Sequence, residues 1–261
     1  MSVSLIITTY NRPDALLLVL LSIAGQMTLP DEVIIADDGS DSESQKLITD
    51  FRQSSNLNIM HSWQEDKGFR AAKSRNKAIS KSNGDYIVLI DGDMILHPEF
   101  INDHINQAQP SYFVQGSRVL LTEDKTNQTL DQQKINFSLL SNGLQNRKNA
   151  FHSNILSKLF SNKRNYLRGI RTCNMAFYKQ DCININGFNN EFEGWGREDS
   201  EFIMRLLNSG INRKNVRFNA IQFHLWHNEN IRDSLEKNDA ILQEAIENRT
   251  KWCSNGIDSY L

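Results

Sequence analysis

The first hundred residues alternate short apolar segments with amphipathic ones, and this alternation restricts the fold more than any other feature. Four segments are short, apolar and rich in β-branched residues, as buried strands are: 3–9, 32–36, 57–62 and 86–90. Between them lie three segments with the length and apolar spacing of helices: 14–23, 42–53 and 71–81. Strands separated by helices form βαβ units, so we expect an α/β fold with a mainly parallel sheet flanked by helices.

The second part of the chain is less regular. Strand-like segments are expected at 113–121, 172–179 and 220–226, and helices at 199–209 and 234–252. The length of 261 residues fits one large domain.

Three of the expected strands end in polar clusters. Thr8, Thr9, Tyr10 and Asn11 follow the first strand, Asp37 and Asp38 the second, and Asp91, Gly92 and Asp93 the fourth. Parallel sheets bind their ligands at the carboxyl ends of the strands. The three clusters are therefore expected to open onto one edge of the sheet and to form a binding site there.

The segment Asp91-Gly92-Asp93 indicates a metal site. A glycine between two carboxylates lets the backbone turn so that both approach one cation, and Mg²⁺ and Mn²⁺ prefer oxygen ligands. The alternative is an ordinary Asp-Gly turn. A second candidate is the pair His224 and His227, which has a spacing suited to metal binding but is also unremarkable among six histidines.

The most unusual segment runs from Gly194 to Glu201. Trp195 stands between two glycines, which favours an exposed aromatic ring of the kind that stacks on a sugar. Glu198, Asp199 and Glu201 follow at the start of a helix, where the dipole favours acids without any catalytic role.

Charge and cysteine content exclude several classes of protein. The net charge of −2 argues against a nucleic-acid-binding protein. Three widely spaced cysteines read as reduced thiols, and the N-terminus lacks a secretory signal, so we expect a cytoplasmic protein. The longest apolar run, 15–25, is too short to span a bilayer. The segments typical of dinucleotide-binding and P-loop enzymes are absent from the sequence.

Four ordered motifs resemble the family 2 glycosyltransferases of the GT-A fold. They are IITTYNRP (6–13), EVIIADDGS (32–40), GFRAAKSRN (68–76) and DYIVLIDGD (85–93). Further on, NMAF (174–177), GFN (187–189) and GWGRED (194–199) resemble a carboxy-terminal half of the galactosyltransferase type, as in the N-acetylgalactosaminyltransferase module of bacterial chondroitin polymerase. The resemblance implies one GT-A domain, with a nucleotide-sugar half (1–96), an acceptor and catalytic half (97–230) and a C-terminal helix (231–261).

The resemblance also implies roles for individual residues. The uridine of a UDP-sugar would be held by Thr9, Tyr10, Arg12 and Asp38, with Asp37 as an alternative to Asp38 and with Arg75 and Asn76 near the nucleotide. Asp91, Gly92 and Asp93 would contact the ribose and hold Mn²⁺ or Mg²⁺ on the diphosphate, with His224 or His227 as a further ligand. Trp195 and Glu198 would bind the acceptor, and Asp199, paired with Glu198, would be the catalytic base. Arg197 departs from the family pattern, in which this residue is often small.

These assignments predict an inverting transfer of a hexose or N-acetylhexosamine to a glycan or lipid-linked acceptor, giving a β linkage. Two alternatives remain: a module that binds nucleotide-sugar or glycan without turnover, and a sugar-phosphate nucleotidyltransferase. The latter class normally opens with a glycine-rich loop, which the segment 8–12 lacks.

One stretch has a distinct charge. Between Gln132 and Gln180 there is no Asp or Glu, whereas the stretch holds nine basic residues: Lys134, Arg147, Lys148, Lys158, Lys163, Arg164, Arg168, Arg171 and Lys179. The stretch 132–180 is either a solvated surface or a platform for an anionic acceptor glycan or a membrane surface.

Overall fold

The computed structural model describes residues 1–228 and 233–261, and its elements alternate as the sequence predicts. The helices are α1 (Pro13–Ala24), α2 (Ser42–Ser54), α3 (Ala71–Lys81), α4 (Phe100–Gln107), α5 (Glu123–Gln132), α6 (Asn154–Phe160), α7 (Lys179–Asn184), α8 (Glu198–Asn208) and α9 (Leu235–Glu247), with short 3₁₀ turns at Arg147–Ala150 and Ile257–Tyr260. The strands are β1 (Val3–Thr9), β2 (Glu32–Asp37), β3 (Ile59–Trp63), β4 (Tyr86–Asp91), β5 (Met94–Leu96), β6 (Tyr112–Gln115), β7 (Arg118–Leu121), β8 (Leu144–Gln145), β9 (Asn162–Lys163), β10 (Asn174–Tyr178), β11 (Asn212–Asn215) and β12 (Gln222–His224).

Two sheets organise these strands. The larger has the order β3-β2-β1-β4-β10-β6-β11-β9, and the smaller has the order β5-β12-β7-β8. Strands β1 to β4 are parallel, and β10 joins antiparallel between β4 and β6. The expected α/β architecture is therefore confirmed, with a parallel half that becomes mixed beyond β4.

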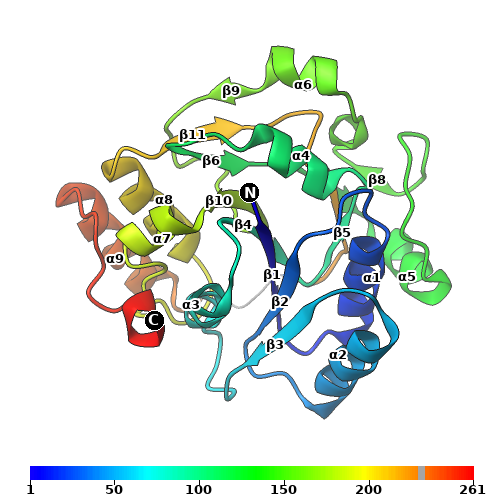
Figure 1. The fold of residues 1–261 in the computed structure, drawn as a ribbon, viewed down its shortest axis with the longest axis horizontal. Helices are drawn as coiled ribbons and strands as arrows, with labels where there is room; N and C mark the ends of the chain where they lie inside the picture. Colours follow the sequence, from blue (N-terminus) through cyan, green and yellow to red (C-terminus); the bar gives the residue numbers. More distant parts are fainter. Residues whose placement is uncertain (229–232) are drawn as a thin grey trace.

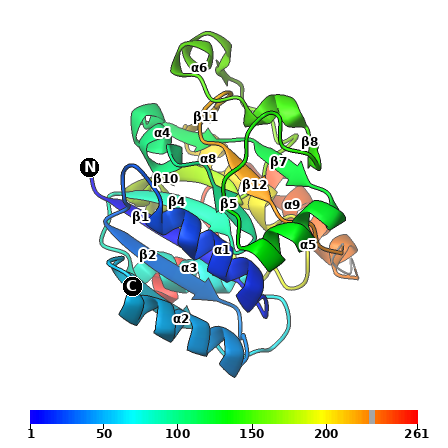
Figure 2. The same ribbon diagram turned by 90° about the vertical axis from the view of Figure 1, so that its right-hand side faces the viewer.

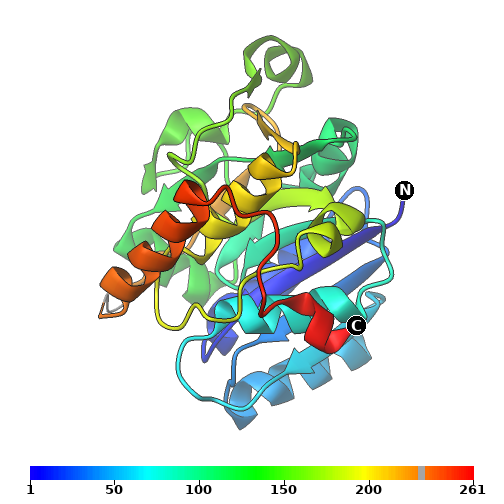
Figure 3. The same cartoon turned by 90° about the vertical axis from the view of Figure 1, so that its left-hand side faces the viewer.

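Helices cover both faces of the large sheet (Figure 1). Figure 2 shows α1 and α2 in front of the strands, and Figure 3 shows α3, α8 and α9 on the opposite face. Alternation along β1 explains this arrangement, because successive side chains point to opposite faces of a sheet. Leu5 and Ile7 belong to the core beneath α1, whereas Ile6 packs into the core beneath α3 and α8.

The segment 113–121, expected as one strand, is divided between the two sheets. Strand β6 ends at Gln115 and β7 begins at Arg118. The break lies where Gly116 donates its N–H to the carbonyl of Asn174 (3.0 Å), and a Cβ on Gly116 would lie 2.3 Å from Oδ1 of Asn174. The close approach of Gly116 to Asn174 does not change the apolar pattern of 113–121. The pattern is continuous, so it did not predict the break between β6 and β7.

Other boundaries shift by a few residues. The helix expected at 234–252 extends only over α9, and the strand expected at 220–226 only over β12. The expected boundary between 97–230 and 231–261 lies outside the described residues. Within 1–228 and 233–261, no helix combines the length and the apolar character needed to cross a bilayer.

Helix α8 contains a buried ion pair and packs through a buried aromatic contact on the segment that follows α7. The Phe202 ring stacks on Phe188 with centroids 4.1 Å apart. Arg205 donates from Nε and Nη2 to the two carboxylate oxygens of Glu201, at 2.6 and 2.8 Å, and both side chains are almost fully buried. Because Glu198 and Asp199 begin this helix, these contacts also set the position of the expected catalytic acids.

Replacing Arg205 by alanine is expected to lower the free energy of unfolding by about 3–5 kcal/mol, because Glu201 would keep a buried charge without a partner. Urea unfolding followed by circular dichroism measures the loss. The matched control is Arg52→Ala, since Arg52 also lies in the last turn of a helix but is exposed; its cost should stay within about 0.5 kcal/mol. Equal costs for the two variants would contradict this account of α8.

Candidate active site

The carboxyl ends of β1, β2 and β4 meet at one edge of the large sheet, as the sequence predicts. Thr9 lies opposite Asp37 in the pairing of β1 with β2, and Thr8 lies opposite Asp91 in the pairing of β1 with β4. Gly92 donates its N–H to the carbonyl of Thr8 at 2.7 Å. A Cβ on Gly92 would lie 2.9 Å from Oγ1 of Thr9, so the backbone approaches β1 closely at this turn.

The Asp91-Gly92-Asp93 turn links the two sheets and brings a distant histidine to the site. Strand β5 begins directly after Asp93 and pairs antiparallel with β12, so that Met94 lies opposite His224. The N–H of Leu225 also donates to the carbonyl of Asp93, at 3.0 Å. The small sheet therefore places His224 beside Asp93 although the two are far apart in the sequence.

Asp93, His224 and His227 form a group whose ligand atoms all lie within 4.8 Å of one another. Nε2 of each histidine lies 3.4 Å from Oδ2 of Asp93. Oδ1 of Asp93 is buried and has no hydrogen-bond partner among the described residues. A buried carboxylate oxygen without a donor normally carries a desolvation cost, and a cation at this point would remove it. The residues therefore fit a divalent metal.

The surroundings of Asp93 keep its carboxylate charged. Burial alone would raise its pKa, but the hydrogen bond from His224 and the nearby His224, His227 and Arg12 side chains hold the pKa of Asp93 below its usual range. Nη1 of Arg12 lies 3.7 Å from Oδ2 of Asp93. Asp91 lies outside the group of three in the described part of the chain, so its role as a metal ligand stays a prediction.

Arg75 connects the first Asp of this turn with the acids of α8. Its side chain is only 5% exposed, and Nη2 lies 3.5 Å from Oδ1 of Asp91. Nη1 lies 3.3 Å from Oε1 of Glu198 and 3.5 Å from Oδ1 of Asp199. Nε donates to Oγ1 of Thr8 at 3.1 Å. Although burial opposes the charge, the three carboxylates raise the pKa of Arg75, so the guanidinium remains a buried cation between them.

The segment before α8 adopts a backbone that explains its glycines. Gly194, Gly196 and Arg197 all have left-handed φ angles, of 72°, 110° and 76°. A Cβ on Gly194 would lie 2.2 Å from Oγ of Ser234. Trp195 between them is 37% exposed. This sharp turn presents Trp195 and the first turn of α8 to the same space.

The two acids at the start of α8 have different environments. Asp199 accepts hydrogen bonds from the N–H of Thr172 (2.9 Å) and from its hydroxyl (2.8 Å), which fix the orientation of the carboxylate. Burial, and after it the charge of Asp199, raises the pKa of Glu198 to about 7, against the opposing effect of Arg75. Near neutral pH, Glu198 can therefore donate or accept a proton.

Almost all of the expected site residues line one cavity of about 1100 Å³. Its lining includes thirteen of the fifteen residues expected from the sequence: Thr9, Tyr10, Arg12, Asp38, Arg75, Asp91, Gly92, Asp93, Trp195, Glu198, Asp199, His224 and His227. Arg197 lines it too, while its Nε donates to Asp239 of α9. The lining of the cavity extends from the strand ends to the start of α8.

Asp37 and Asn76 are the two expected residues that do not line this cavity in the described chain. Oδ1 of Asp37 accepts the N–H of Ser40 (2.7 Å), and Oδ2 lies 2.8 Å from Nε2 of His61. The Asn76 amide exchanges hydrogen bonds with the backbone of Phe188, at 2.6 and 2.8 Å. Both side chains hold the walls of the site together, and their direct contact with a nucleotide stays a prediction.

Several residues that line the cavity were not assigned to the site from the sequence. Thr172, which orients Asp199, was expected only as the start of a strand, and Arg118 and Arg171 line the cavity without belonging to any motif. Gln64 donates to Oδ1 of Asp38 at 2.6 Å, so this carboxylate is already partly occupied. Trp226 also lines the cavity, and its place between His224 and His227 is a signal that could have identified it.

Comparisons with known proteins agree with this geometry. The family model of glycosyl transferase family 2 matches residues 4–184, and that of the N-terminal domain of galactosyltransferase matches residues 154–228. The chain therefore belongs to glycosyl transferase family 2, and it is a glycosyltransferase by class. Both halves of the resemblance drawn from the motifs are confirmed.

The similar proteins include two synthases of polysaccharides. The chain is 28% identical to hyaluronan synthase of Pasteurella multocida over 226 residues (79% of this chain and 23% of the relative). It is 28% identical to chondroitin synthase of Escherichia coli over 242 residues (85% of this chain and 34% of the relative). The chain thus spans about a quarter to a third of the length of these curated relatives.

Solved structures support the GT-A fold. S. aureus TarS 1–349 in complex with UDP has a TM-score of 0.63 at 16% identity, covering 93% of this chain and 64% of TarS. The complex of the same protein with UDP-GlcNAc has a TM-score of 0.59 at 18% identity, covering 88% of this chain and 60% of TarS. At this level of identity the likeness concerns the fold.

Proposed function

We propose that the chain transfers a hexose or N-acetylhexosamine from a UDP-sugar to a glycan or lipid-linked acceptor, with inversion to a β linkage. The observation that carries the proposal is that one cavity is lined by the group Asp93, His224 and His227 and by the two acids Glu198 and Asp199. Arg75 connects the Asp91-Gly92-Asp93 turn with α8 through its contacts with Asp91 and both acids of α8.

The donor would occupy the strand ends. Thr9, Tyr10, Arg12 and Asp38 line this part of the cavity and are the residues that the family resemblance assigns to uridine. The TarS structures with UDP and UDP-GlcNAc support a nucleotide-sugar donor. A hexose and an N-acetylhexosamine differ at one substituent, and the donor panel described below distinguishes between them.

The metal would be Mn²⁺, with Mg²⁺ as the alternative. Two imidazole nitrogens and one carboxylate suit a transition-metal cation better than Mg²⁺, which prefers oxygen ligands throughout. When bound, a divalent cation supplies Lewis-acid stabilisation of the negative charge that develops on a diphosphate leaving group.

Asp199 would act as general base. The acceptor hydroxyl loses its proton as it attacks the anomeric carbon, and the two hydrogen bonds from Thr172 hold the carboxylate in one orientation for this step. One displacement from the face opposite the leaving group inverts the anomer, so the reaction needs no carboxylate nucleophile. Trp195 would stack on the acceptor ring, and Glu198 would hydrogen-bond one of its hydroxyls.

The surroundings of the enzyme are part of the same proposal. Cys173, Cys182 and Cys253 are all free and buried, as expected for reduced thiols, and a nucleotide-sugar donor is a cytoplasmic metabolite. We therefore expect the chain to work in the cytoplasm, with a lipid-linked acceptor on the adjoining membrane surface.

A panel of UDP-sugars in the presence of Mn²⁺ tests the function. One or a few donors should release UDP slowly alone and faster with an acceptor glycan, and chelation of the metal should abolish the release. Binding of UDP without any release under these conditions would favour a binding module. Release of pyrophosphate in place of UDP would favour a nucleotidyltransferase.

A further inference from the structure

The short helix α6 projects from the body and exposes apolar side chains. It lies at one extremity of the molecule in all three views (Figures 1, 2 and 3). Ile155, Leu159 and Phe160 are 74%, 71% and 52% exposed, respectively. Three large apolar side chains on one seven-residue helix are a concentrated patch, and such patches mark interaction surfaces.

A cavity lined by three lysines lies directly beside this patch. Its volume is about 650 Å³, and its lining contains Lys158, Lys163 and Lys214 together with amides and hydroxyls. No acid is among its lining residues, and these three lysines form no ion pair with a carboxylate among the described residues. A concave site with three cations and many hydrogen-bond donors suits a phosphate-bearing ligand.

Lys214 at this cavity is partly buried and lies near the positive charge of Lys163. Nζ of Lys214 donates to the carbonyl of Gln107 at 2.9 Å, and burial, with Lys163 second, lowers the pKa of Lys214. Nζ of Lys163 lies 4.1 Å from the centroid of the Tyr112 ring. A bound anion would relieve both the repulsion and the lost hydration.

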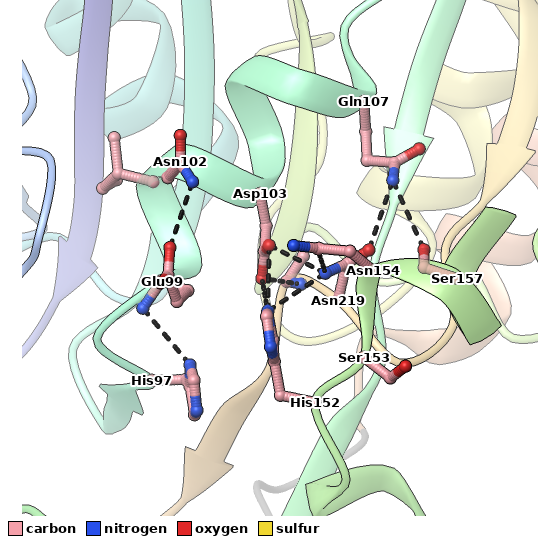
Figure 4. A network of polar contacts seen from close by, with 12 residues as sticks. His97, Glu99, Asn102, Asp103, Gln107, His152, Ser153, Asn154, Ser157 and Asn219 are labelled. Carbon is pink, nitrogen blue, oxygen red and sulfur yellow. Dashed lines mark hydrogen bonds and ion pairs between the residues drawn. The ribbon is translucent and has the colours of Figure 1, made fainter.

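The wall of this cavity is held rigidly to the body. Figure 4 shows Gln107 of α4, Asn154 and Ser157 of α6, and Asn219 linked in one network. Asn219 also donates to buried Asp103 at 2.8 Å. Helix α6 is therefore held in a fixed position beside the lysine cavity.

We propose that α6 and the lysine cavity dock on an anionic membrane surface, with lipid phosphates at Lys158, Lys163 and Lys214 and with Ile155, Leu159 and Phe160 entering the interfacial region. Apolar side chains beside basic ones are the combination by which peripheral proteins bind anionic lipids. Eight of the nine basic side chains in the acid-free stretch 132–180 are exposed, and their positive charge adds to the attraction to anionic lipids.

Charge and shape favour this occupant over two others. A symmetric dimer through α6 would bring lysines of the two copies together, which costs free energy. A glycan would bind in the lysine cavity alone, so Ile155 and Leu159 would stay exposed to water. The use of the surface rests on the proposed lipid-linked acceptor, but the binding itself is independent of sugar transfer.

Co-sedimentation of the full chain with vesicles tests the proposal. Vesicles of phosphatidylcholine mixed with phosphatidylglycerol should bind the chain, and vesicles of phosphatidylcholine alone should bind it weakly. Lys158→Gln/Lys163→Gln should weaken binding about thirtyfold, since each basic residue near an anionic surface contributes about 1 kcal/mol. Ile155→Ser/Leu159→Ser should weaken it by at least about tenfold.

Matched variants elsewhere on the surface are the controls. Lys46→Gln/Lys237→Gln and Met27→Ser/Leu29→Ser change exposed residues of the same kinds on other elements and should leave binding unchanged. Release of UDP from a soluble UDP-sugar should be equal in all variants, which separates a failure of docking from a failure of the proposed transferase.

Three results would overturn the proposal. They are equal binding to both kinds of vesicle, unchanged vesicle binding in both the lysine and the apolar double variants, and a dimer in sedimentation velocity that Ile155→Ser/Leu159→Ser dissociates. Binding of a soluble anionic polysaccharide that Lys158→Gln/Lys163→Gln abolishes, without binding to vesicles, would assign the cavity to a glycan instead.

Discussion

Replacing Asp199 by asparagine is expected to lower the rate of sugar transfer by about 10²–10⁴-fold while UDP binding stays unchanged. The amide keeps the size of the carboxylate and can still accept the hydroxyl of Thr172, but it cannot take up the proton of the acceptor. UDP is expected at Thr9, Tyr10 and Asp38, which line the same cavity at the ends of β1 and β2. Initial rates with saturating donor, together with calorimetric titration of UDP, measure the two quantities separately.

Asp181→Asn is the matched control for this variant. Asp181 also lies in the first turn of a helix, α7, but it is not among the residues that line the cavity. Glu198→Gln is a second comparison, since Glu198 and Asp199 both contact Arg75. This variant should weaken acceptor binding more than it lowers the maximal rate of transfer. Transfer by Asp199→Asn at the rate of Asp181→Asn would remove Asp199 from the role of base.

Replacing Asp93 by alanine is expected to abolish the effect of Mn²⁺ on UDP binding. Asp93 is the only carboxylate in the group with His224 and His227 in the described chain, and its oxygens lie toward both histidines. Loss of residues that merely support a ligand costs about 10–100-fold in metal affinity, so loss of a ligand itself should exceed about 100-fold. Titration of Mn²⁺, followed by electron paramagnetic resonance with and without UDP, measures the affinity.

Asp91→Asn distinguishes the two acids of the turn. If Asp91 binds the metal, this variant should also lose Mn²⁺ affinity. If Asp91 acts through the ribose or through Arg75, UDP binding should fall equally with and without metal. Glu123→Gln, an exposed acid in the first turn of α5, is the control. Unchanged Mn²⁺ affinity in Asp93→Ala would refute the assignment of the metal site.

Much of the first hundred residues could be predicted from the sequence because the signals there are local. Strand β4 and helix α3 need only a run of apolar residues or an apolar face, and the polar residues at Thr9, Asp38 and Asp91 mark strand ends that parallel pairing must bring together. The family resemblance added a prediction for the two acids of α8, since Glu198 and Asp199 belong to the motif GWGRED (194–199).

The later part of the chain was less predictable because its contacts join distant segments. The division of 113–121 between two sheets depends on the approach of Gly116 to Asn174, and the orientation of Asp199 depends on Thr172. Neither contact leaves a periodic pattern. The same holds for the lysine cavity, in which Lys158 and Lys163 are joined by Lys214 from β11.

The sequence by itself therefore determined the fold class, the edge of the sheet that bears the site and the residue types that serve it, because apolar periodicity is a local signal and parallel strands place their carboxyl ends at one edge. Only the tertiary structure decided which side chains meet. The pairing of β5 with β12 brings both histidines to Asp93, and the burial of Arg75 joins Asp91 to the acids of α8. These contacts depend on how two sheets and a helix pack together, and packing of distant elements follows from shape and burial that no single segment encodes.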